Sequence, residues 1–324
     1  MYTKKEIQEI ISSAFHSANF HFEPLSLYDP IKYMMDLGGK RLRPVLALMS
    51  CDLFGGEIND ALAPAMGLEL FHNFTLLHDD IMDQAPIRRG KETVFKKWNT
   101  NSAILSGDTL FVMAYELVTK TTPALLPQVL ELFNDTARKV CEGQQYDMDY
   151  EVKADVSIEH YILMIRLKTA VLISCSLKLG AIIARASDEE ADLIYAFGEN
   201  LGLAFQLQDD YLDVFGEVDK FGKEIGNDIV TNKKTFLYLK AFELASGNTL
   251  ETLRSCFSGN SITSAEKVNT ITKIYRDLKI DILTRELIGE YFSKALSIME
   301  KIHIPEYKKQ ILLEIAGQMV NRET

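Results

Sequence analysis

Residues 188–215 read DEEADLIYAFGENLGLAFQLQDDYLDVF, and this stretch decides the fold class. Apolar side chains recur three to four positions apart along it, as at Leu193, Phe197 and Leu201, which is the spacing of one face of an α-helix. Ser187 before the stretch and Glu190 three positions later have the spacing of a capping box, which marks a helix start. The stretch therefore predicts one long helix that carries the acidic pattern DDYLD near its end.

The same helical periodicity extends over much of the chain. Residues 128–304 contain no proline, although they are rich in Leu, Ile, Ala, Glu and Lys, which favour helices. Apolar positions again fall three to four apart in residues 158–176, where Ser157 is placed as a helix start. Alternating patterns bounded by turn residues, which are typical of strands, are absent from the sequence. We expect an all-α protein in which residues 1–324 form a single domain and residues 215–234 form the longest internal loop.

Charge and composition exclude several classes of protein. The chain has 324 residues, of which 35 are Lys or Arg and 46 are Asp or Glu, so its net charge is −11. That acid excess argues against a partner made of duplex nucleic acid, which is bound mostly through Lys and Arg. The four cysteines lie far apart without a CxxC pair, so neither a disulfide framework nor a zinc ribbon is indicated. Charged residues in the first ten positions and the lack of a long uncharged apolar stretch predict a soluble cytoplasmic protein with no signal peptide and no membrane span.

Two aspartate clusters share the pattern DDxxD. The first consists of Asp79, Asp80 and Asp83, and the second consists of Asp209, Asp210 and Asp213. On a helix, positions i and i+4 share a face, so the first and last aspartates of each cluster point the same way. Such carboxylates repel one another at the unfavourable end of a helix dipole, and a hard divalent cation such as Mg²⁺ would offset that repulsion. Two solvated helix ends without a metal are the alternative interpretation.

Basic residues in glycine-rich turns accompany the aspartates. Residues 38–43 (GGKRLR) precede the first cluster, residues 88–91 (RRGK) follow it, and three lysines flank the second cluster, namely Lys168, Lys223 and Lys233. Glycine lets the backbone approach a ligand closely, and arginine offers a two-pronged donor to phosphate. Each turn by itself could be a solvated loop. Together with the aspartates they indicate a pocket for two diphosphates, one held through metal and the other held directly by cations.

These residues resemble those of the trans-isoprenyl diphosphate synthases, the polyprenyl synthetase family. The resemblance runs from about Gly38 to Lys234 through the motifs GGKRLRP, LLHDDIMDQAPIRRG, KKWNTNSAILSGD, GQQYDM, LKTA, FQLQDDYLDVFG, GKEIGND and NKKT. It implies a homodimer of single all-helical domains with the isoprenoid synthase fold, each built around a deep central cavity. It also implies a Mg²⁺-dependent transferase that condenses isopentenyl diphosphate with an allylic diphosphate (dimethylallyl, geranyl or farnesyl). The implied product is a short-chain prenyl diphosphate, farnesyl or geranylgeranyl.

The resemblance also assigns roles to individual residues. The metal ligands would be Asp79, Asp83 and Asp209, and the other catalytic carboxylates would be Asp80, Asp210 and Asp213. The allylic diphosphate would be contacted by Arg88, Lys168, Lys223 and Lys233. The isopentenyl diphosphate would be held by Lys40, Arg43, His72 and Arg89. Thr169 and Gln206 would present oxygens to the developing allylic cation, so they join Lys168 in the catalytic set.

Product length is expected to depend on the residues that precede the first aspartate cluster. In the family, bulky side chains one or two turns before these aspartates block elongation of the product. Phe74, with Phe71 a turn further away, therefore predicts a short product, whereas the small Thr75 leaves room beside it. Some relatives close the site with a basic C-terminal tail, but Arg322 is the basic residue left near this end, so tail closure is not expected.

Three other interpretations remain open. Glu69-x-x-His72 and Glu300-x-x-His303 match an element of helical di-iron proteins, although such sites need glutamates from two more helices. A terpene cyclase would share the helical bundle and one aspartate motif, but it would need a different second metal motif. A non-catalytic partner subunit would keep the fold, and the intact metal and phosphate residues argue against it.

Overall fold

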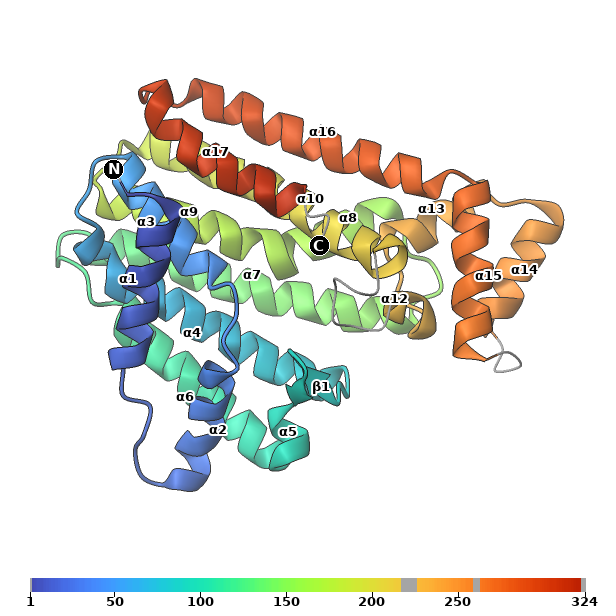
Figure 1. Ribbon diagram of the computed structural model, residues 1–324, viewed down its shortest axis with the longest axis horizontal. Helices are drawn as coiled ribbons and strands as arrows, with labels where there is room; N and C mark the ends of the chain where they lie inside the picture. Colours follow the sequence, from blue (N-terminus) through green and yellow to red (C-terminus); the bar gives the residue numbers. More distant parts are fainter. Residues whose placement is uncertain (1, 217–225, 259–262, 322–324) are drawn as a thin grey trace. The chain divides into compact units, whose positions relative to one another are not determined.

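Helices dominate the described part of the chain, which comprises residues 2–216, 226–258 and 263–321 of the computed structural model (Figure 1). Within these residues the β structure consists of one hairpin, β1 (Ile87–Arg88) and β2 (Lys91–Glu92). The two strands are antiparallel, and Arg88 is opposite Lys91. The all-α prediction is therefore confirmed.

One compact unit comprises Met1–Ala137, Leu172–Ala196 and Met299–Ile315. The helices in its first segment are α1 (Lys4–Ser17), α2 (Leu25–Asp36), α3 (Leu42–Leu53), α4 (Ile58–Met82), α5 (Val94–Lys97) and α6 (Thr100–Val118). Helix α4 lies along α6, and α3 also packs against α4. Because α4 is covered on several sides, it buries side chains around most of its circumference, including Leu68, Leu70 and Phe71. Its C-terminal end carries the first aspartate cluster.

A second compact unit comprises Arg138–Val171, Phe197–Ile298 and Ala316–Thr324. It contains α8 (Ile158–Ile165), the π-helical turn η1 (Arg166–Ala170), α12 (Asn227–Val230), α13 (Phe236–Leu244), α14 (Gly247–Ser258) and α15 (Ser264–Asp277). Leu237, Leu253 and Tyr275 are buried in the hydrophobic core of α12 to α15. Five helices contribute residues to both units: α7 (Leu126–Val152), α9 (Val171–Ile183), α10 (Asp188–Phe215), α16 (Ile280–Lys301) and α17 (Glu306–Val320). The single-domain interpretation stays a prediction.

Both helix starts that the sequence indicates are present. The Ser187 hydroxyl accepts a hydrogen bond from the Glu190 N–H at 3.3 Å, and α10 begins at the intervening Asp188. Ser157 caps α8 through a reciprocal pair of hydrogen bonds with His160. In both cases a side-chain oxygen satisfies a backbone N–H that the first helical turn leaves without a partner.

The continuous helix expected over residues 158–176 is interrupted by η1, where the Val171 N–H bonds to the Arg166 carbonyl. Two glycines from other helices pack against this wider turn. A Cβ atom at Gly143 of α7 would lie 2.3 Å from the Lys168 backbone nitrogen, and one at Gly202 of α10 would lie 2.6 Å from the Ala170 Cα. Only glycine permits such close approach, so the π turn depends on tertiary packing that periodicity does not reveal.

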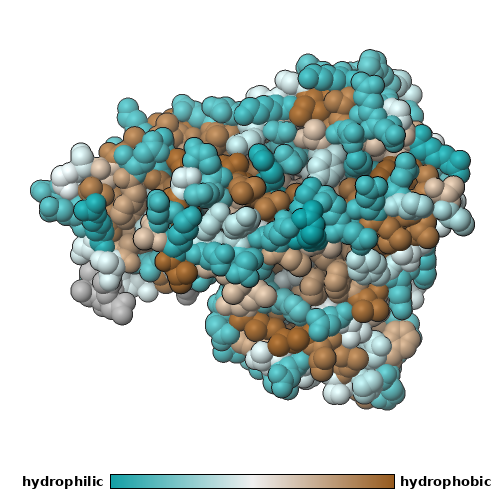
Figure 2. Space-filling view, turned by 180° about the vertical axis from the view of Figure 1, so that it is seen from behind, coloured by the Kyte–Doolittle hydropathy of each residue, from teal (hydrophilic) through white to brown (hydrophobic). Residues whose placement is uncertain are grey.

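Hydrophobic and hydrophilic side chains are intermingled on the face shown in Figure 2, where the hydrophobic ones form several separate groups. No helix in the described residues combines the length and the low polarity needed to cross a lipid bilayer.

Candidate active site

The first aspartate cluster divides into an accessible pair and a buried member. Asp79 is half-buried and Asp83, which ends α4, is exposed, whereas Asp80 is only 2% exposed. The Asp83 N–H donates to the Asp79 carbonyl at 2.8 Å, so the chain is still helical at this point. The first and last aspartates of the cluster are therefore more exposed than the middle one.

Arg88 holds the buried aspartate. The β1–β2 hairpin that follows α4 brings the Arg88 Nε to 2.9 Å from both carboxylate oxygens of Asp80 and its Nη2 to 3.3 Å from Asp79. Burial raises the pKa of Asp80, although the hydrogen bonds and charge of Arg88 oppose this shift. Burial also acts to lower the pKa of Arg88, but the three nearby aspartates outweigh it and leave that pKa raised. Both side chains are thus held as an ion pair at the end of α4.

A cluster of cations lies one to two turns earlier, around His72 of α4. Burial lowers the pKa of His72 well below its usual value, and the charges of Arg43, Arg89 and Arg88 add to this effect, so His72 is neutral at pH 7. Burial likewise lowers the pKa of Arg43 to about 10, opposed by Glu69. The structure therefore brings three of the four residues predicted to hold isopentenyl diphosphate into one electrostatic neighbourhood. The fourth, Lys40, is exposed in the α2–α3 turn.

The turn before α3 is built around Arg89. The Arg89 guanidinium donates to the Gly38 carbonyl, and a Cβ atom at Gly39 would lie 2.9 Å from the Arg89 Cζ. Gly39 also has a φ of 140°, which residues with side chains rarely adopt. The Nε of Arg43 and the Oε2 of Glu69 are buried without a hydrogen-bond partner among the described residues. An unsatisfied buried donor beside further arginines suits an anionic ligand.

Two of the three residues predicted to limit product length, Phe71 and Phe74, belong to an aromatic cluster, and the Thr75 hydroxyl donates to the His72 carbonyl. Phe71 is fully buried, while Phe74 and Thr75 are half-buried. The Phe74 ring stacks on Phe111 of α6, with centroids 4.9 Å apart and planes 11° apart. Phe71 contacts Phe111 and also Phe133 of α7, at 5.5 Å and 5.3 Å between centroids. Phe74 is therefore held against α6, and the neighbouring Phe71 also contacts α7.

The second aspartate cluster repeats the pattern of the first, because Asp209 and Asp213 are half-buried and Asp210 is only 4% exposed. The Tyr161 hydroxyl donates to the Asp210 Oδ2, and the Gln206 Nε2 donates to the Oδ1 at 2.8 Å. Burial and the nearby Asp228 raise the pKa of Asp210 to about 7, opposed by Lys233 and by these two donors. Asp213 accepts from the backbone N–H of Asp228 at 2.9 Å. In both clusters the second aspartate is thus buried and hydrogen-bonded.

Lys168 and Lys233, both predicted to contact diphosphate, both act electrostatically on Asp147 of α7. The Lys168 Nζ lies 2.6 Å from the Asp147 Oδ2. Burial acts to raise the pKa of Asp147, but the charges of Lys233 and Lys168 outweigh it and lower that pKa. Next to Lys168, the Thr169 hydroxyl donates to the Gln206 Oε1 at 2.9 Å, so the two residues predicted to face the cation are in direct contact. Lys223 lies outside the described residues, as does Arg322.

Sequence reasoning missed two participants, Asp147 and Tyr161. Asp147 belongs to the motif GQQYDM, which could have marked it as a site residue. The motif does not reveal that this aspartate pairs with Lys168. Tyr161 shows no signal, because its partner Asp210 is 49 positions away and the contact exists only in the folded chain.

Metal binding would rest on oxygen donors. Within the described segments, no three His, Cys, Asp or Glu side chains are grouped so as to hold a metal ion by themselves. Mg²⁺ commonly takes one or two carboxylates and completes its shell with water and substrate phosphates. The accessible carboxylates of both clusters fit that ligand chemistry.

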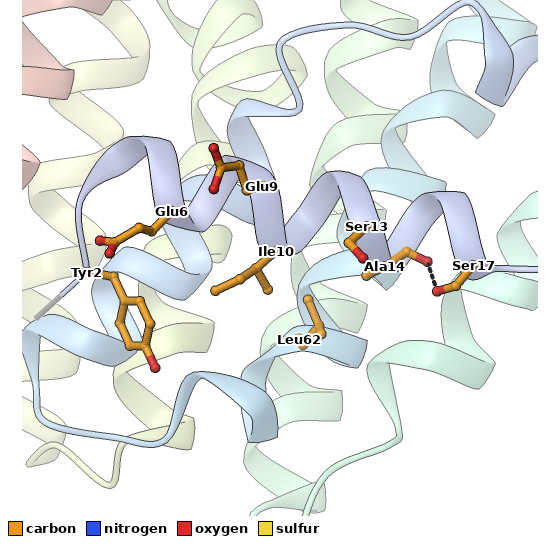
Figure 3. Close-up of a pocket in the computed structure, with 8 residues that line it drawn as sticks. All are labelled: Tyr2, Glu6, Glu9, Ile10, Ser13, Ala14, Ser17 and Leu62. Carbon is orange, nitrogen blue, oxygen red and sulfur yellow. Dashed lines mark hydrogen bonds between the residues drawn. The ribbon is translucent and has the colours of Figure 1, made fainter.

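Two surface pockets differ in their relation to these residues. One of about 590 Å³ is lined by Tyr2, by residues of α1 and by Leu62 of α4 (Figure 3), and its charged lining residues are the acidic Glu6 and Glu9. The other, of about 510 Å³, is lined partly by Gly90, Lys91 and Glu92 of the hairpin that carries Arg88. The first pocket is therefore poorly suited to a diphosphate, and neither pocket includes a predicted site residue.

Comparisons with known proteins find similarity over most of the chain. Residues 24–276 match the family described as Polyprenyl synthetase. The geranylgeranyl diphosphate synthase of Methanosarcina mazei is 35% identical over 303 residues, which are 93% of this chain and 91% of that protein. The short chain isoprenyl diphosphate synthase of Methanothermobacter thermautotrophicus is 41% identical over 247 residues, 76% of each chain. A crystal structure of a geranylgeranyl pyrophosphate synthase covers 100% of both chains with a TM-score of 0.95 and 45% identity.

Proposed function

Because the chain belongs to the polyprenyl synthetase family, we propose that it is a short-chain trans-prenyl diphosphate synthase. This transferase would condense isopentenyl diphosphate with an allylic diphosphate. The observation that carries the proposal is the common construction of the two DDxxD clusters. In each cluster the outer carboxylates are accessible, and the buried one is hydrogen-bonded.

The proposed reaction needs no nucleophile from the protein. The allylic C1–O bond breaks and diphosphate leaves with the bonding electrons. The double bond of isopentenyl diphosphate then forms the new carbon–carbon bond at C1, and a proton is lost to the released diphosphate. Arg88, Lys168 and Lys233 would stabilise the leaving group by charge, which is the largest contribution expected in a site that excludes water. The Thr169 and Gln206 oxygens would stabilise the cation.

We propose Mg²⁺ as the metal, with Asp79, Asp83 and Asp209 as ligands. Bound there, it would act as a Lewis acid on the diphosphate. The two DDxxD clusters together contain six aspartates, without which the net charge would be −5 instead of −11. Arg43, Arg89 and the neutral His72 would bind isopentenyl diphosphate together with Lys40 and without metal. The buried unpaired Arg43 Nε supports that assignment.

Geranylgeranyl diphosphate is the product that we propose first, with farnesyl diphosphate as the shorter alternative. Phe74 would limit the length of the growing chain, and its stacking on Phe111 supports a fixed barrier. Thr75 is smaller and leaves room beside that barrier. The names of the relatives given above also agree with a short product.

We also propose that the whole chain acts as one synthase domain in the cytoplasm and forms a homodimer through α6. Leu105 and Val112 lie two turns apart on one face of this helix, and each is 59% exposed; Ile104 beside them is 40% exposed. Exposed apolar residues in such a row favour burial against a second copy. Leu105→Lys should convert the dimer to a monomer in sedimentation velocity, whereas an unchanged sedimentation coefficient would assign the interface elsewhere.

The rival functions gain no support. The relatives are named as synthases, and no cyclase or di-iron protein is among those reported. His72 has its pKa lowered by burial and by three arginines, an environment that repels a metal cation and argues against an iron ligand. Iron analysis of the purified protein tests this point directly.

The decisive test is incubation of the purified chain with isopentenyl diphosphate, Mg²⁺ and each of dimethylallyl, geranyl and farnesyl diphosphate. The products are separated by chromatography after removal of the diphosphate. Formation of a C15 or C20 prenyl product is expected. The absence of product with every primer would refute the synthase assignment and favour a non-catalytic subunit.

A further inference from the structure

A chain of four side chains connects the interior of the second unit to the residues proposed to face the cation. Tyr161 of α8 donates to Asp210, Asp210 accepts from the Gln206 amide at 2.8 Å, and the Gln206 Oε1 accepts from the Thr169 hydroxyl at 2.9 Å. Tyr161 and Asp210 are 1% and 4% exposed, whereas Thr169 and Gln206 are half-buried. The chain therefore begins in the protein interior and ends at two half-buried residues.

The two donors to Asp210 fix the orientation of the Gln206 amide. The Gln206 Nε2 donates to the Oδ1 at 2.8 Å and the Tyr161 hydroxyl donates to the Oδ2, so the NH₂ side of the amide faces Asp210. The Gln206 oxygen then faces Thr169 and takes its hydroxyl hydrogen. With that hydrogen engaged, the Thr169 oxygen has only lone pairs to present to a ligand.

We propose that Asp210 and Tyr161 are positioning residues that fix the Gln206 amide, so that Thr169 and Gln206 present oxygen lone pairs to the allylic cation. This inference rests on the proposed synthase function. A rotated amide would direct its oxygen at the Asp210 carboxylate and an N–H at Thr169. The Thr169 hydrogen would then be free to point toward the cation and destabilise it.

A purely structural role for the buried pair makes a different prediction. Loss of a structural hydrogen bond would lower the unfolding temperature, but it would not specifically lower kcat. Loss of orientation would lower kcat, because the oxygens matter when the cation forms, and would leave KM for both substrates nearly unchanged. The two roles are therefore separable by kinetics.

The test begins with Tyr161→Phe, which keeps the ring and removes the donor. A fall in kcat of about 10-fold or more is expected, since a hydrogen bond to a charged group is lost, with each KM within about twofold of wild type. Tyr275→Phe is the matched control, because Tyr275 is also 1% exposed in the second unit but belongs to the α12–α15 core. The control should retain wild-type kcat. Equal kcat for Tyr161→Phe and wild type would overturn the inference.

A double-variant comparison identifies the route of the effect. If Tyr161 acts through Thr169, the double variant Tyr161→Phe, Thr169→Val should have the kcat of Thr169→Val alone. A double-variant loss in kcat equal to the product of the two single-variant losses would show that Tyr161 does not act through Thr169, and would overturn the inference. Should Tyr161→Phe fail to fold by circular dichroism, Asp210→Asn replaces it in the same comparison. Recovery of Asp210→Asn activity by excess Mg²⁺ would assign Asp210 to metal binding and refute its role in orienting Gln206.

Wild-type turnover distinguishes this inference from the proposed function. If the wild-type chain forms no product, the synthase assignment itself fails. If the wild-type chain is active and the variants match it, only the orientation of Gln206 by Asp210 and Tyr161 is refuted.

Discussion

Gly143→Ala is expected to damage catalysis more than stability. A Cβ atom at Gly143 would lie 2.3 Å from the Lys168 nitrogen and 2.6 Å from the Leu167 carbonyl carbon. Both are backbone atoms, so no side-chain rotation relieves the clash. An ordinary contact begins at 3.4 Å, so the π turn would have to move by about 1.1 Å, the difference between 3.4 Å and 2.3 Å. This turn carries Lys168 and Thr169.

Two opposing effects determine how much Gly143→Ala changes the free energy of unfolding. Overpacking a dense interior costs about 1–3 kcal/mol, and replacing glycine by alanine within a helix recovers about 0.5–1 kcal/mol. A net loss of up to about 2.5 kcal/mol in unfolding free energy is therefore expected. A displacement of about 1 Å in catalytic groups can lower kcat about 100-fold. A 100-fold fall in kcat corresponds to about 2.7 kcal/mol of activation free energy, which exceeds the expected loss of stability.

The assay combines steady-state turnover of labelled isopentenyl diphosphate with urea unfolding. Gly289→Ala on α16 is the control, because nothing lies within 4 Å of the added Cβ and the position is exposed. The control should keep wild-type kcat and become about 0.5–1 kcal/mol more stable. If Gly143→Ala behaves like the control in both measurements, the argument from close packing is wrong.

Phe74→Ala and Phe111→Ala should each lengthen the product seen by chromatography, because the two rings stack at 4.9 Å and each holds the other in place; an unchanged product distribution in both would remove this pair as the length limit. Asp79→Ala and Asp209→Ala should lower turnover by about 100-fold or more while far-UV circular dichroism stays unchanged, and wild-type turnover in either variant would contradict its role as a metal ligand. The pKa of Asp147 is lowered by Lys233 and Lys168 despite burial, so its stabilising effect is present above an unfolded value of about 4 and is lost as the pH falls below it. The free energy of unfolding, measured by urea titration, should therefore fall more steeply below about pH 4 in wild type than in Asp147→Asn. Equal pH dependence in the two proteins would show that the lysines do not stabilise the Asp147 carboxylate.

Much of the fold and part of the site follow from local rules. The spacing of apolar residues predicts α10, and the Ser187–Glu190 pair predicts its start, because both depend on neighbours within four positions. The same i to i+4 rule predicts that Asp79 and Asp83 lie on one face of a helix. The periodicity of residues 158–176 does not predict η1, because that turn is set by Gly143 and Gly202 on other helices.

By itself, the sequence determined that this protein is helical, that it carries two DDxxD clusters with their accompanying cations, and that it resembles the prenyl synthases. Only the tertiary structure decided which member of each cluster is buried and what holds it. Arg88 reaches Asp80 because a hairpin turns the chain back, and Tyr161 reaches Asp210 across 49 positions because α8 and α10 pack together. Helix periodicity is set by short-range backbone geometry, whereas a hydrogen bond between distant side chains exists only after packing has brought their helices together.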